Sequence, residues 1–473
     1  MFAPRLVESD RLNAPGAGTF RPFAVSESGA MTSWWRPGFH FTPARNWMND
    51  PNGLVRLDGR YHLFFQHNPY GDRWGSMSWG HAVSPDLVRW TELPVALPAT
   101  PDEQRFSGSA VPDGDGLVAA YTSVDPGGRQ TQAFLRSPDG TDWQRLPGRL
   151  TDPDPDFRDP RLIRTADGWL LLVALSRQRK VRFYRSADLR RWTAVGEFGP
   201  AAPLDGIWEM PDLLRFPTGD VLVVGVITGG PGGGSGTHCF VGEFDGSTFR
   251  ATGSHWADHG PDFYAAASFA GLGDRAVWMG WLNDWRYAEA VPTAPWRGVL
   301  SVPRELSLRD GRLVQRPVPE LGWTELGTYA EPAGELPVCG DQLRLELELA
   351  GPGGVVVRRS ATEGTRVGWD GGRLVLDRRR SGRSDLHPDF AAAYAAPLPV
   401  PGPITVLVDR CSVEVFAGPV TLSGQVFPSP GSAGVSAYGR VARLIVSRPR
   451  QPDPHRSASQ QGCGREQDGR TQW

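Results

Sequence analysis

The sequence predicts an all-β protein in which a β-propeller is followed by a β-sandwich. Short strand-like runs such as LVRLDGRYHLFFQ and VLVVGVI fill residues 54–300, and helical periodicity is nearly absent. The pattern Ser-x-Asp-x-x-x-Trp recurs at 84–90, 137–143 and 186–192, with a looser copy at 243–249. A repeat of about 50 residues with several strands is typical of propeller blades, which bury their faces against one another. In each copy we expect the Ser/Asp turn to close the hairpin between a blade's outer strands.

The same patterns indicate the domain boundaries. We expect the propeller over residues 35–318 and a linker over the Pro- and Gly-containing stretch 319–335. Alternating strands such as QLRLELELA and PITVLVDRCSVEVFA predict an antiparallel sandwich over residues 336–449. Residues 1–34 and 450–473 are polar or broken by Pro and Gly, and we expect both ends to be disordered.

Charge and hydropathy exclude several classes of partner. The chain has 50 basic and 52 acidic residues, which argues against nucleic acid or an anionic membrane as a partner. No run of about 18 apolar residues predicts a membrane span. The N-terminal stretch has no continuous apolar segment of a secretory signal, so we expect a cytoplasmic protein, with Met31 as an alternative start. The sequence leaves the oligomeric state open.

The sequence also argues against a bound metal. The cysteines are far apart and form no C-x-x-C pair, which does not suit a zinc site. In TDPDPDFRDP, Asp152, Asp154 and Asp156 have the spacing of a calcium loop. Phe157 stands where such a loop needs glycine, and no flanking helices are predicted. We therefore expect these aspartates to form a solvated rim and the protein to need no metal.

Three carboxylates stand out by their context. Asp50 lies in NWMNDPNG, Asp159 in FRDP and Glu209 in IWEMPDL, each close to an aromatic residue and a proline. D-P and N-G are strong turn signals, so NWMNDPNG alone would indicate a surface turn. However, the three carboxylates fall in different repeats, and equivalent strands of a propeller converge on its axis. We therefore expect them to meet at one end of the central channel.

A meeting of carboxylates suits glycoside hydrolysis, in which one attacks the anomeric carbon and another protonates the leaving oxygen. The apolar neighbours Trp208 and Met210 are expected to keep Glu209 protonated. Asp50, among amides and backbone donors, is expected to stay ionised. The 18 tryptophans are consistent with sugar binding, because flat indole faces stack on sugar rings.

The motifs as a set resemble glycoside hydrolase family 32, the family of invertases, levanases, inulinases and fructan exohydrolases. The resemblance covers residues 35–449 and includes GSMSWGHAVSPDLVRW and VDRCSVEVFAG. Seven further motifs occur in the order of that family: WMNDPNG, FSGSA, FRDP, WEMPDL, DFYA, GWLNDW and PWRGVLSVPREL.

The resemblance implies a five-bladed propeller followed by a β-sandwich, and cleavage of β-fructofuranosides with retention of configuration. It implies that Asp50 is the nucleophile, that Glu209 is the general acid and then the base, and that Asp159 binds fructose hydroxyls and stabilises the transition state. It implies no metal or organic cofactor. The positions that match the family's fructose pocket are Trp47, Asn49, Gln66, Trp74, Phe106, Ser107, Arg158 and Trp296.

The chain departs from the family pattern at two positions. Met210 stands where the family usually has cysteine after the acid/base glutamate, and Cys411 stands where serine is common. The thioether of Met210 puts the pH optimum in doubt but not the reaction.

Several activities remain open on the sequence alone. The rivals within the family are a sucrose-specific invertase, a sucrose-6-phosphate hydrolase and a fructosyltransferase. Outside catalysis, a propeller that only binds glycans would have lost Asp50 or Glu209, and both are present. Segment 284–298, DWRYAEAVPTAPWRG, is more similar to the levanase and inulinase type. We therefore expect an exo-acting enzyme that releases fructose from fructans, fructo-oligosaccharides and sucrose.

Overall fold

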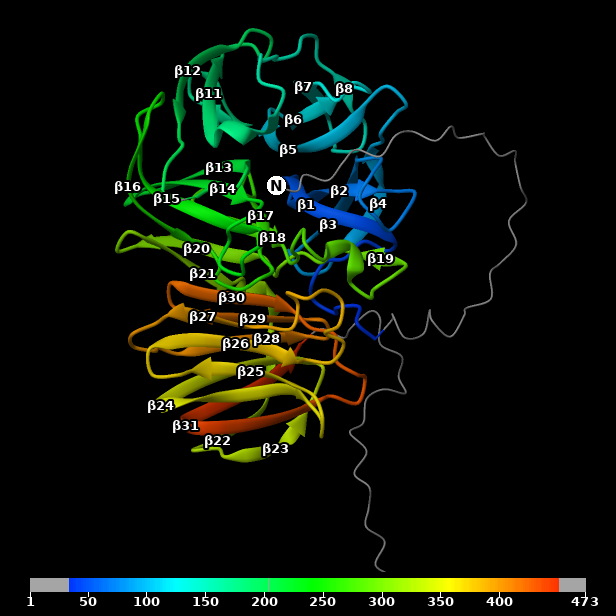
Figure 1. Cartoon of the computed structure of the whole chain (residues 1–473). Coiled ribbons are helices and arrows are strands. Elements are labelled where there is room, and N and C mark those ends of the chain that lie inside the picture. The colour runs from blue at the N-terminus through cyan, green and yellow to red at the C-terminus, as the bar shows by residue number, and fades with distance from the viewer. Residues whose placement is uncertain (1–33, 203, 451–473) are drawn as a thin grey trace, which may run out of the picture.

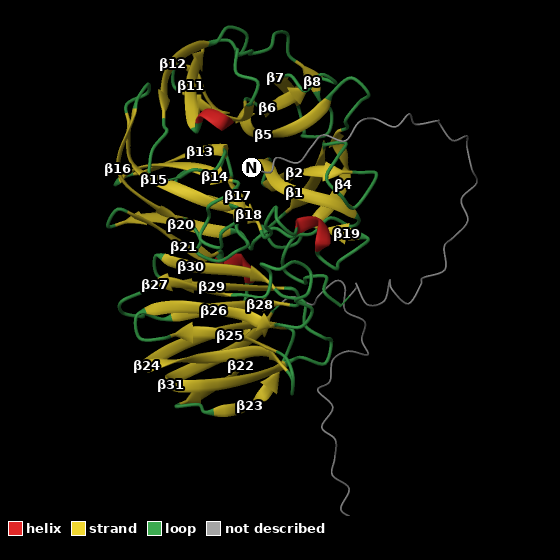
Figure 2. Cartoon of the chain, viewed as in Figure 1, coloured by secondary structure: helices red, strands yellow, loops and turns green. Residues whose placement is uncertain are grey.

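The protein consists of a ring of five small sheets and a larger, layered sheet that lies below the ring in Figure 1. The computed structural model describes residues 34–202 and 204–450. Nearly all regular structure is β-strand (Figure 2). The only helices of the described residues are short 3-10 turns, η1 (Ser176–Gln178), η2 (Ala288–Ala290) and η3 (Pro319–Leu321). The prediction of an all-β fold with a five-bladed propeller is therefore confirmed.

Each blade is an antiparallel sheet whose strands follow one another in the chain. Blade 1 contains β1 (Asn46–Leu57), β2 (Arg60–Asn68), β3 (Ser78–Ser84) and β4 (Thr91–Leu97), and blade 2 contains β5 (Gln104–Asp113), β6 (Gly116–Val124), β7 (Gln130–Ser137) and β8 (Gln144–Arg145). Blade 3 contains β9 (Phe157–Thr165), β10 (Gly168–Leu175), β11 (Lys180–Ser186) and β12 (Thr193–Phe198), and blade 4 contains β13 (Trp208–Phe216), β14 (Gly219–Val226), β15 (Gly236–Phe244) and β16 (Phe249–Trp256). Blade 5 contains β17 (Tyr264–Ser268), β18 (Val277–Trp281), β20 (Arg304–Arg309) and β21 (Arg312–Pro317).

The first strands of the five blades, β1, β5, β9, β13 and β17, pack side by side around the axis (Figure 1). Blade 1 also pairs in parallel with the short β19 (Trp296–Arg297), which belongs to the long connection between β18 and β20. The ring therefore places residues from all five repeats around one axis.

The repeated Ser-x-Asp-x-x-x-Trp turn closes the hairpin between the third and fourth strands of blades 1, 2 and 3, as predicted. In blade 1, Ser84 Oγ accepts the N–H of Asp86, and Asp86 Oδ1 accepts the N–H of Arg89 at 2.8 Å. Trp90 Nε1 then donates to the carbonyl of Leu87 at 3.0 Å. The equivalent bonds of Trp143 and Trp192 repeat this geometry in the next two blades. The repeat is thus a structural turn rather than part of a site.

The C-terminal region is a ten-stranded sheet folded into two layers. The first half of the long strand β24 pairs with β28 and its second half pairs with β25, so that this strand crosses from one layer to the other. The layers enclose a core of Val, Leu and Ile side chains. The strands are β22 (Trp323–Ala330), β23 (Gly334–Cys339), β24 (Gln342–Arg359), β25 (Gly364–Trp369), β26 (Arg373–Arg380), β27 (Ala393–Pro397), β28 (Ile404–Asp409), β29 (Ser412–Ala417), β30 (Val420–Gln425) and β31 (Gly434–Pro449).

The linker expected over residues 319–335 differs in the structure. After η3, strand β22 pairs with β31 from Trp323↔Pro449 to Ala330↔Arg443, so most of this stretch belongs to the sandwich. In the stretch WTELGTYA exposure alternates only from Leu326 to Ala330, because Thr324, Glu325 and Leu326 are all exposed, so the sequence shows only a weak strand pattern here. The terminal stretches 1–33 and 451–473, where disorder is expected, lie outside the described residues. Among the described residues, no helix has the length and apolar character needed to cross a membrane.

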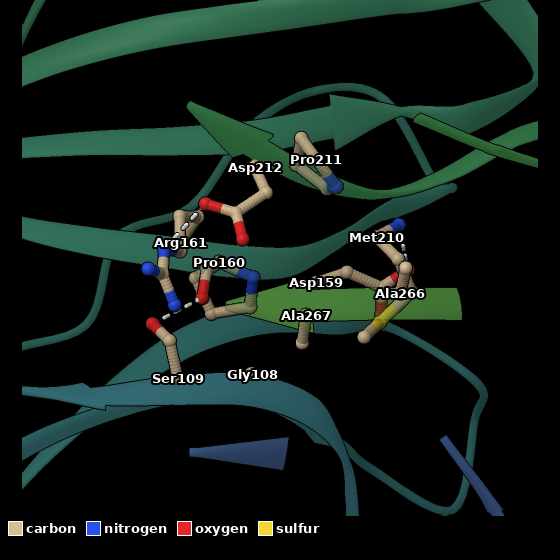
Figure 3. A pocket seen from close by; sticks show the side chains of 10 residues that line it. All are labelled: Gly108, Ser109, Asp159, Pro160, Arg161, Met210, Pro211, Asp212, Ala266 and Ala267. Carbon is tan, nitrogen blue, oxygen red and sulfur yellow. Dashed lines mark hydrogen bonds and ion pairs between the residues drawn. The ribbon is translucent and has the colours of Figure 1, made fainter. Parts of the chain in front are cut away.

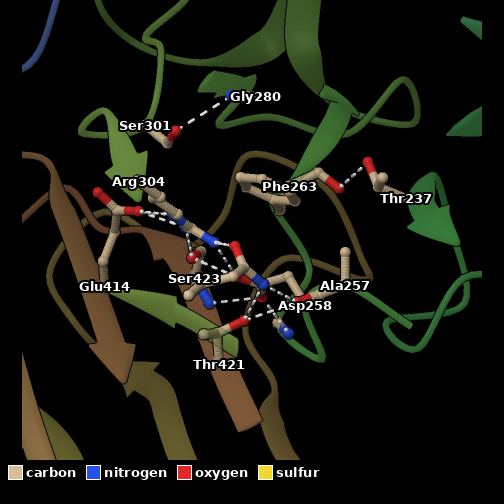
Figure 4. A network of polar contacts seen from close by, with 12 residues as sticks. Thr237, Ala257, Asp258, Phe263, Gly280, Ser301, Arg304, Glu414, Thr421 and Ser423 are labelled. Atoms are coloured by element: carbon tan, nitrogen blue, oxygen red, sulfur yellow. Dashed lines mark hydrogen bonds and ion pairs between the residues drawn. The ribbon is translucent and has the colours of Figure 1, made fainter. Parts of the chain in front are cut away.

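A buried polar network joins the propeller to the sandwich (Figure 4). Arg304, at the start of β20, contacts Glu414 of β29 and lies 3.1 Å from Asp258 of blade 4's exit loop. Ser423 of β30 donates to Asp258 at 2.7 Å. All of these side chains are excluded from solvent, so the charges are compensated by one another rather than by water. The two domains are therefore fixed to each other.

Candidate active site

The innermost strand of every blade carries an irregularity near the axis, where one strand holds an extra residue. In β13 the bulge falls between Glu209 and Asp212, and in β17 between Tyr264 and Ala267. The strands β1, β5 and β9 show the same disturbance. A bulge turns side chains away from the regular alternation of a strand. This repeated irregularity gathers the polar residues of five blades at one end of the ring.

Asp50 lies within the bulge of β1 and is nearly excluded from water. Its Oδ2 accepts a hydrogen bond of 2.6 Å from Ser107 Oγ, which sits in the bulge of β5. Burial, opposed by the bond from Ser107 and reinforced by the charge of Glu209, raises the pKa of Asp50 to about 6. Asp50 is thus still mostly ionised at neutral pH, as a nucleophile requires.

Asp159 occupies the bulge of β9 with a left-handed backbone, φ 61°. Its Oδ2 accepts the N–H of Met210 at 3.0 Å, and its own N–H donates to Thr122 Oγ1 at 2.9 Å. Burial and the charges of Glu209 and Asp50 raise the pKa of Asp159. A non-glycine residue held in this conformation indicates that the surrounding contacts fix its position. The bond from Met210 comes from the backbone, so the methionine that replaces the family's cysteine leaves it in place.

Glu209 is held by two donors rather than by apolar neighbours. Its Oε1 accepts a 2.8 Å hydrogen bond from Arg158 Nε, and its Oε2 contacts the hydroxyl of Tyr264. Trp208 is adjacent in sequence but packs into the hydrophobic core between blades 3 and 4, because neighbouring residues of a strand point to opposite faces. The expectation that Trp208 gives the carboxyl group of Glu209 apolar surroundings is therefore wrong, because its two oxygens face the guanidinium of Arg158 and the hydroxyl of Tyr264.

The remaining predicted pocket residues lie on β1, β2, β5 and β19 and in the loop between β2 and β3. Trp47 Nε1 donates to Asn49 Oδ1 at 2.7 Å, and Gln66 Nε2 donates to the carbonyl of Arg105 at 2.9 Å. Trp74 packs edge-on against Phe106, with ring centroids 5.8 Å apart.

Two of the predicted tryptophans differ sharply in exposure. The side chain of Trp74 is 44% exposed at the rim, where a substrate can reach it. Trp296 is 1% exposed and lies on β19, opposite Asn46, with the guanidinium of Arg36 4.7 Å from its ring centroid. Trp296 is therefore buried next to the first residue of β1.

A small cavity is lined by residues of the innermost strands β5, β9, β13 and β17, and Asp159 is one of them (Figure 3). Arg161 of β9 forms a 2.8 Å ion pair with Asp212 of β13 and donates to Ser268 of β17 at 2.7 Å. The N–H of Ser268 in turn donates to Asp212 Oδ2 at 2.8 Å. These bonds tie the inner strands of three blades together. Sequence reasoning did not identify this group.

The aspartates of the possible calcium loop pair with basic and amide side chains. Asp152 Oδ2 accepts from Arg182 at 2.6 Å, and Asp156 Oδ1 accepts from Arg158 at 2.9 Å. Within the described residues, no group of three or more His, Cys, Asp or Glu side chains is arranged to hold a metal ion. Asp156 instead supports Arg158, which contacts Glu209.

The propeller brings three carboxylates and an arginine together at one end of its axis. This arrangement is typical of a glycoside hydrolase, which uses carboxyl groups as nucleophile and acid. The chain belongs to glycosyl hydrolases family 32. The family's N-terminal domain matches residues 40–317 and its C-terminal domain matches residues 322–446.

Individual relatives agree with this assignment. The chain is 39% identical to a levanase of Bacillus subtilis, over 88% of this chain and 70% of that protein. It is 37% identical to an extracellular exo-inulinase of Aspergillus ficuum, over 84% of this chain and 90% of that protein. The crystal structure of an exo-inulinase from Aspergillus awamori superposes with a TM-score of 0.81 at 34% identity, covering 88% of this chain and 98% of the other.

Proposed function

We propose that this protein is an exo-acting, retaining β-fructofuranosidase that releases terminal β-D-fructofuranosyl units from fructans, fructo-oligosaccharides and sucrose. Membership of family 32 makes the chain a fructosyl hydrolase. The observation that carries the catalytic assignment is the grouping of Asp50, Asp159 and Glu209 with Arg158 at the axial end of the propeller. The fructan specificity is supported by the similarity to a levanase and to exo-inulinases.

In the proposed first step, Asp50 Oδ attacks the anomeric carbon of the terminal fructosyl unit. Glu209 gives its proton to the glycosidic oxygen as that carbon–oxygen bond breaks, which leaves a fructosyl ester on Asp50. In the second step the ionised Glu209 takes a proton from water, whose oxygen attacks the same carbon and displaces Asp50. Two displacements retain the configuration. Glu209 is protonated again at the end and Asp50 is an ionised carboxylate.

Asp159 and Arg158 are placed to support these steps. Asp159 accepts a hydrogen bond from the N–H of Met210 and donates its own N–H to Thr122 Oγ1, which fixes it beside the strand of Glu209, where its carboxyl group can accept hydrogen bonds from fructose hydroxyls. Arg158 compensates the negative charge of Glu209 through a short ion pair. Trp74 and Phe106 offer apolar faces at the rim, which suits the C–H face of a sugar ring.

Related activities that use the same chemistry differ in the substrate they cleave or in the acceptor that takes the fructosyl group. Invertase, sucrose-6-phosphate hydrolase and fructosyltransferase activities would use the same carboxylates. The similarity to sucrose-6-phosphate hydrolase from Lactobacillus gasseri is 22% in sequence and concerns the fold alone. The two named groups of relatives above 35% identity, levanase and exo-inulinase, favour fructans.

The decisive experiment is chromatography of the products formed from sucrose, kestose, inulin and levan at low and high sugar concentration. We expect fructose as the growing product from every chain end, with no intermediate oligomers at early times. Intermediate oligomers would indicate endo-cleavage, and products longer than the substrate would indicate transfer. Absence of fructose from all four substrates would contradict the proposal.

A further inference from the structure

Glu209 has a second close neighbour whose role the proposed chemistry leaves unassigned. The hydroxyl of Tyr264, the first residue of β17, donates a hydrogen bond to Glu209 Oε2. Tyr264 is completely buried, and its ring packs near Trp281 with centroids 6.4 Å apart. Since Arg158 already donates to Oε1, each oxygen of this carboxylate has its own donor, and the donors come from two different blades.

The space for this tyrosine is made by a glycine directly opposite Glu209. Gly225 of β14 is the cross-strand partner of Glu209. A Cβ atom at Gly225 would lie 3.0 Å from Cε2, 3.2 Å from Cζ and 3.4 Å from the hydroxyl oxygen of Tyr264. Any side chain at this position would therefore push the phenol. The missing side chain lets a tyrosine from the next blade reach over the strand pair of blade 4 to the acid/base carboxylate.

We propose that Tyr264 is a positioning residue for Glu209, which fixes Oε2 as the oxygen that carries the catalytic proton. The inference rests on the proposed function of Glu209. A guanidinium has no acceptor, so Oε1 must remain an acceptor facing Arg158. A phenol can both donate and accept. When Oε2 is protonated it can donate to Tyr264, and when its proton leaves for the glycosidic oxygen, the hydroxyl turns to donate to the new carboxylate.

The electrostatic surroundings allow this exchange of donor and acceptor. The charged or titratable groups around Glu209 are Arg158 and Asp159 from β9, Asp50 from β1 and Tyr264 from β17. Burial and the nearby carboxylates raise the pKa of Tyr264 well above its ordinary value. The phenol therefore keeps its proton through the whole range in which the enzyme can work, and it supports the ionised form of Glu209 as a neutral donor.

The test is the pH profile of kcat/KM on sucrose for Tyr264→Phe, which removes only the hydroxyl oxygen. Without this donor Glu209 holds its proton to higher pH. We expect the alkaline limb, which reports the general acid of the free enzyme, to move upward by about one pH unit. We also expect kcat to fall by about tenfold, because the weaker acid delivers its proton less readily.

A matched control is Tyr184→Phe, which removes another buried phenol that donates to a carboxylate, at 3.0 Å from Asp152 Oδ2, outside the site. It should leave the pH profile unchanged. A second variant, Gly225→Ala, keeps the phenol but displaces it by a few tenths of an ångström, and we expect a smaller upward shift of the same limb.

The outcomes separate this inference from the proposed function. Wild-type enzyme without fructose-releasing activity would contradict the proposed function itself. Active wild type with an unshifted alkaline limb in folded Tyr264→Phe would overturn the inference, even if kcat fell. If Tyr264→Phe does not fold, the pH profile of Gly225→Ala is the test. An unchanged alkaline limb of kcat/KM in this variant would overturn the role of Tyr264, and an upward shift would support it.

Discussion

The residue Asp50 shows how catalytic function and stability oppose each other in this site. Its raised pKa, about 6, means that the folded protein binds this proton more tightly than the unfolded chain does. The associated stability is present below the ordinary aspartate pKa and is lost as the pH rises through about 6. At neutral pH the protein therefore keeps a buried carboxylate, ready to attack, at a cost of about 3 kcal/mol.

We predict that Asp50→Asn abolishes fructose release at every pH, because an amide is not a nucleophile here. We also predict that it raises the free energy of unfolding at pH 7 by about 1–3 kcal/mol, with little change near pH 3, below the ordinary aspartate pKa, where the carboxyl is largely protonated in both states. Thermal unfolding at the two pH values, with circular dichroism to check the fold, measures both effects. Appreciable turnover by the purified variant would remove Asp50 from the role of nucleophile.

The raised pKa of Asp50 also predicts how kcat/KM of the wild-type enzyme changes with pH on the acidic side. Asp50 must be ionised to attack, so kcat/KM should fall about tenfold per pH unit as the pH drops below about 6. Ser107→Ala removes the 2.6 Å hydrogen bond to the ionised Asp50 and should move this acidic limb to higher pH. An acidic limb that stays in place in the folded Ser107→Ala variant would show that the limb belongs to another group.

For Glu209 the prediction concerns the leaving group. Glu209→Gln cannot donate a proton, so we expect kcat on sucrose to fall by about 10²–10⁴-fold. A fructoside whose leaving group departs without protonation should recover part of the first step, although water attack still lacks its base. Comparing the two substrates by single-turnover kinetics measures this difference. Equal losses on both would argue against the acid role.

Glu209 shows which features of the site could be predicted from the sequence and which could not. Its motif and its distance from Asp50 and Asp159 along the chain predicted that it would lie near the axis. Its surroundings were not predictable, because Arg158 and Tyr264 come from other blades while Trp208, the sequence neighbour, faces the opposite side of the strand. Successive side chains of a strand point to opposite faces, so a side chain does not contact that of its neighbour in sequence.

At the scale of the elements, the bulges do most to shape the site. Gly108, in the FSGSA motif, immediately follows the bulged Ser107 of β5, and a Cβ there would overlap the carbonyl oxygen of Ala120 in β6. The motif indicated the family, but the reason for its glycine is this close approach of two backbones. Strand content and blade order could be predicted from the repeat, whereas β22 could not, since its partner β31 lies over 100 residues away.

We predict that Gly108→Ala displaces β5 and lengthens the bond between Ser107 and Asp50. Because the obstruction is backbone, the strand must move, and we expect a loss of about 1–3 kcal/mol in stability together with reduced kcat. The matched control is Gly253→Ala in β16, where a Cβ would meet nothing within 4 Å. Activity and stability of Gly108→Ala that equal those of Gly253→Ala would show that the close approach is not needed.

At the scale of the whole molecule, the sandwich is attached through charged groups that no local pattern could reveal. The segment before the first blade places His40 between two carboxylates of the sandwich: Nδ1 is 2.8 Å from Asp409 and Nε2 is 2.8 Å from Glu414. Both ring nitrogens face acceptors, so the charged imidazolium suits this place. Glu414 also contacts Arg304 of blade 5, which links His40 to the network at the domain interface.

This arrangement predicts a specific alkaline sensitivity. Burial alone would lower the pKa of His40, but the bonds to Asp409 and Glu414 outweigh it and raise the pKa to about 9. Because the folded-state pKa is raised, the added stability, on the order of 3 kcal/mol, is fully present below the unfolded pKa near 6.5 and is lost as the pH rises through about 9. We expect the wild-type Tm to decline between pH 7 and 10 for this reason.

Replacing His40 should remove the part of the decline in Tm that comes from its deprotonation. His40→Gln cannot be protonated, so its Tm should already be lower at pH 7 and should converge with that of the wild type at pH 10. The half-exposed His387 provides the control, since His387→Gln should decline in parallel with the wild type. Differential scanning calorimetry of the three proteins measures the curves. A constant gap between wild type and His40→Gln from pH 7 to 10 would show that His40 does not hold the two domains together through its charge.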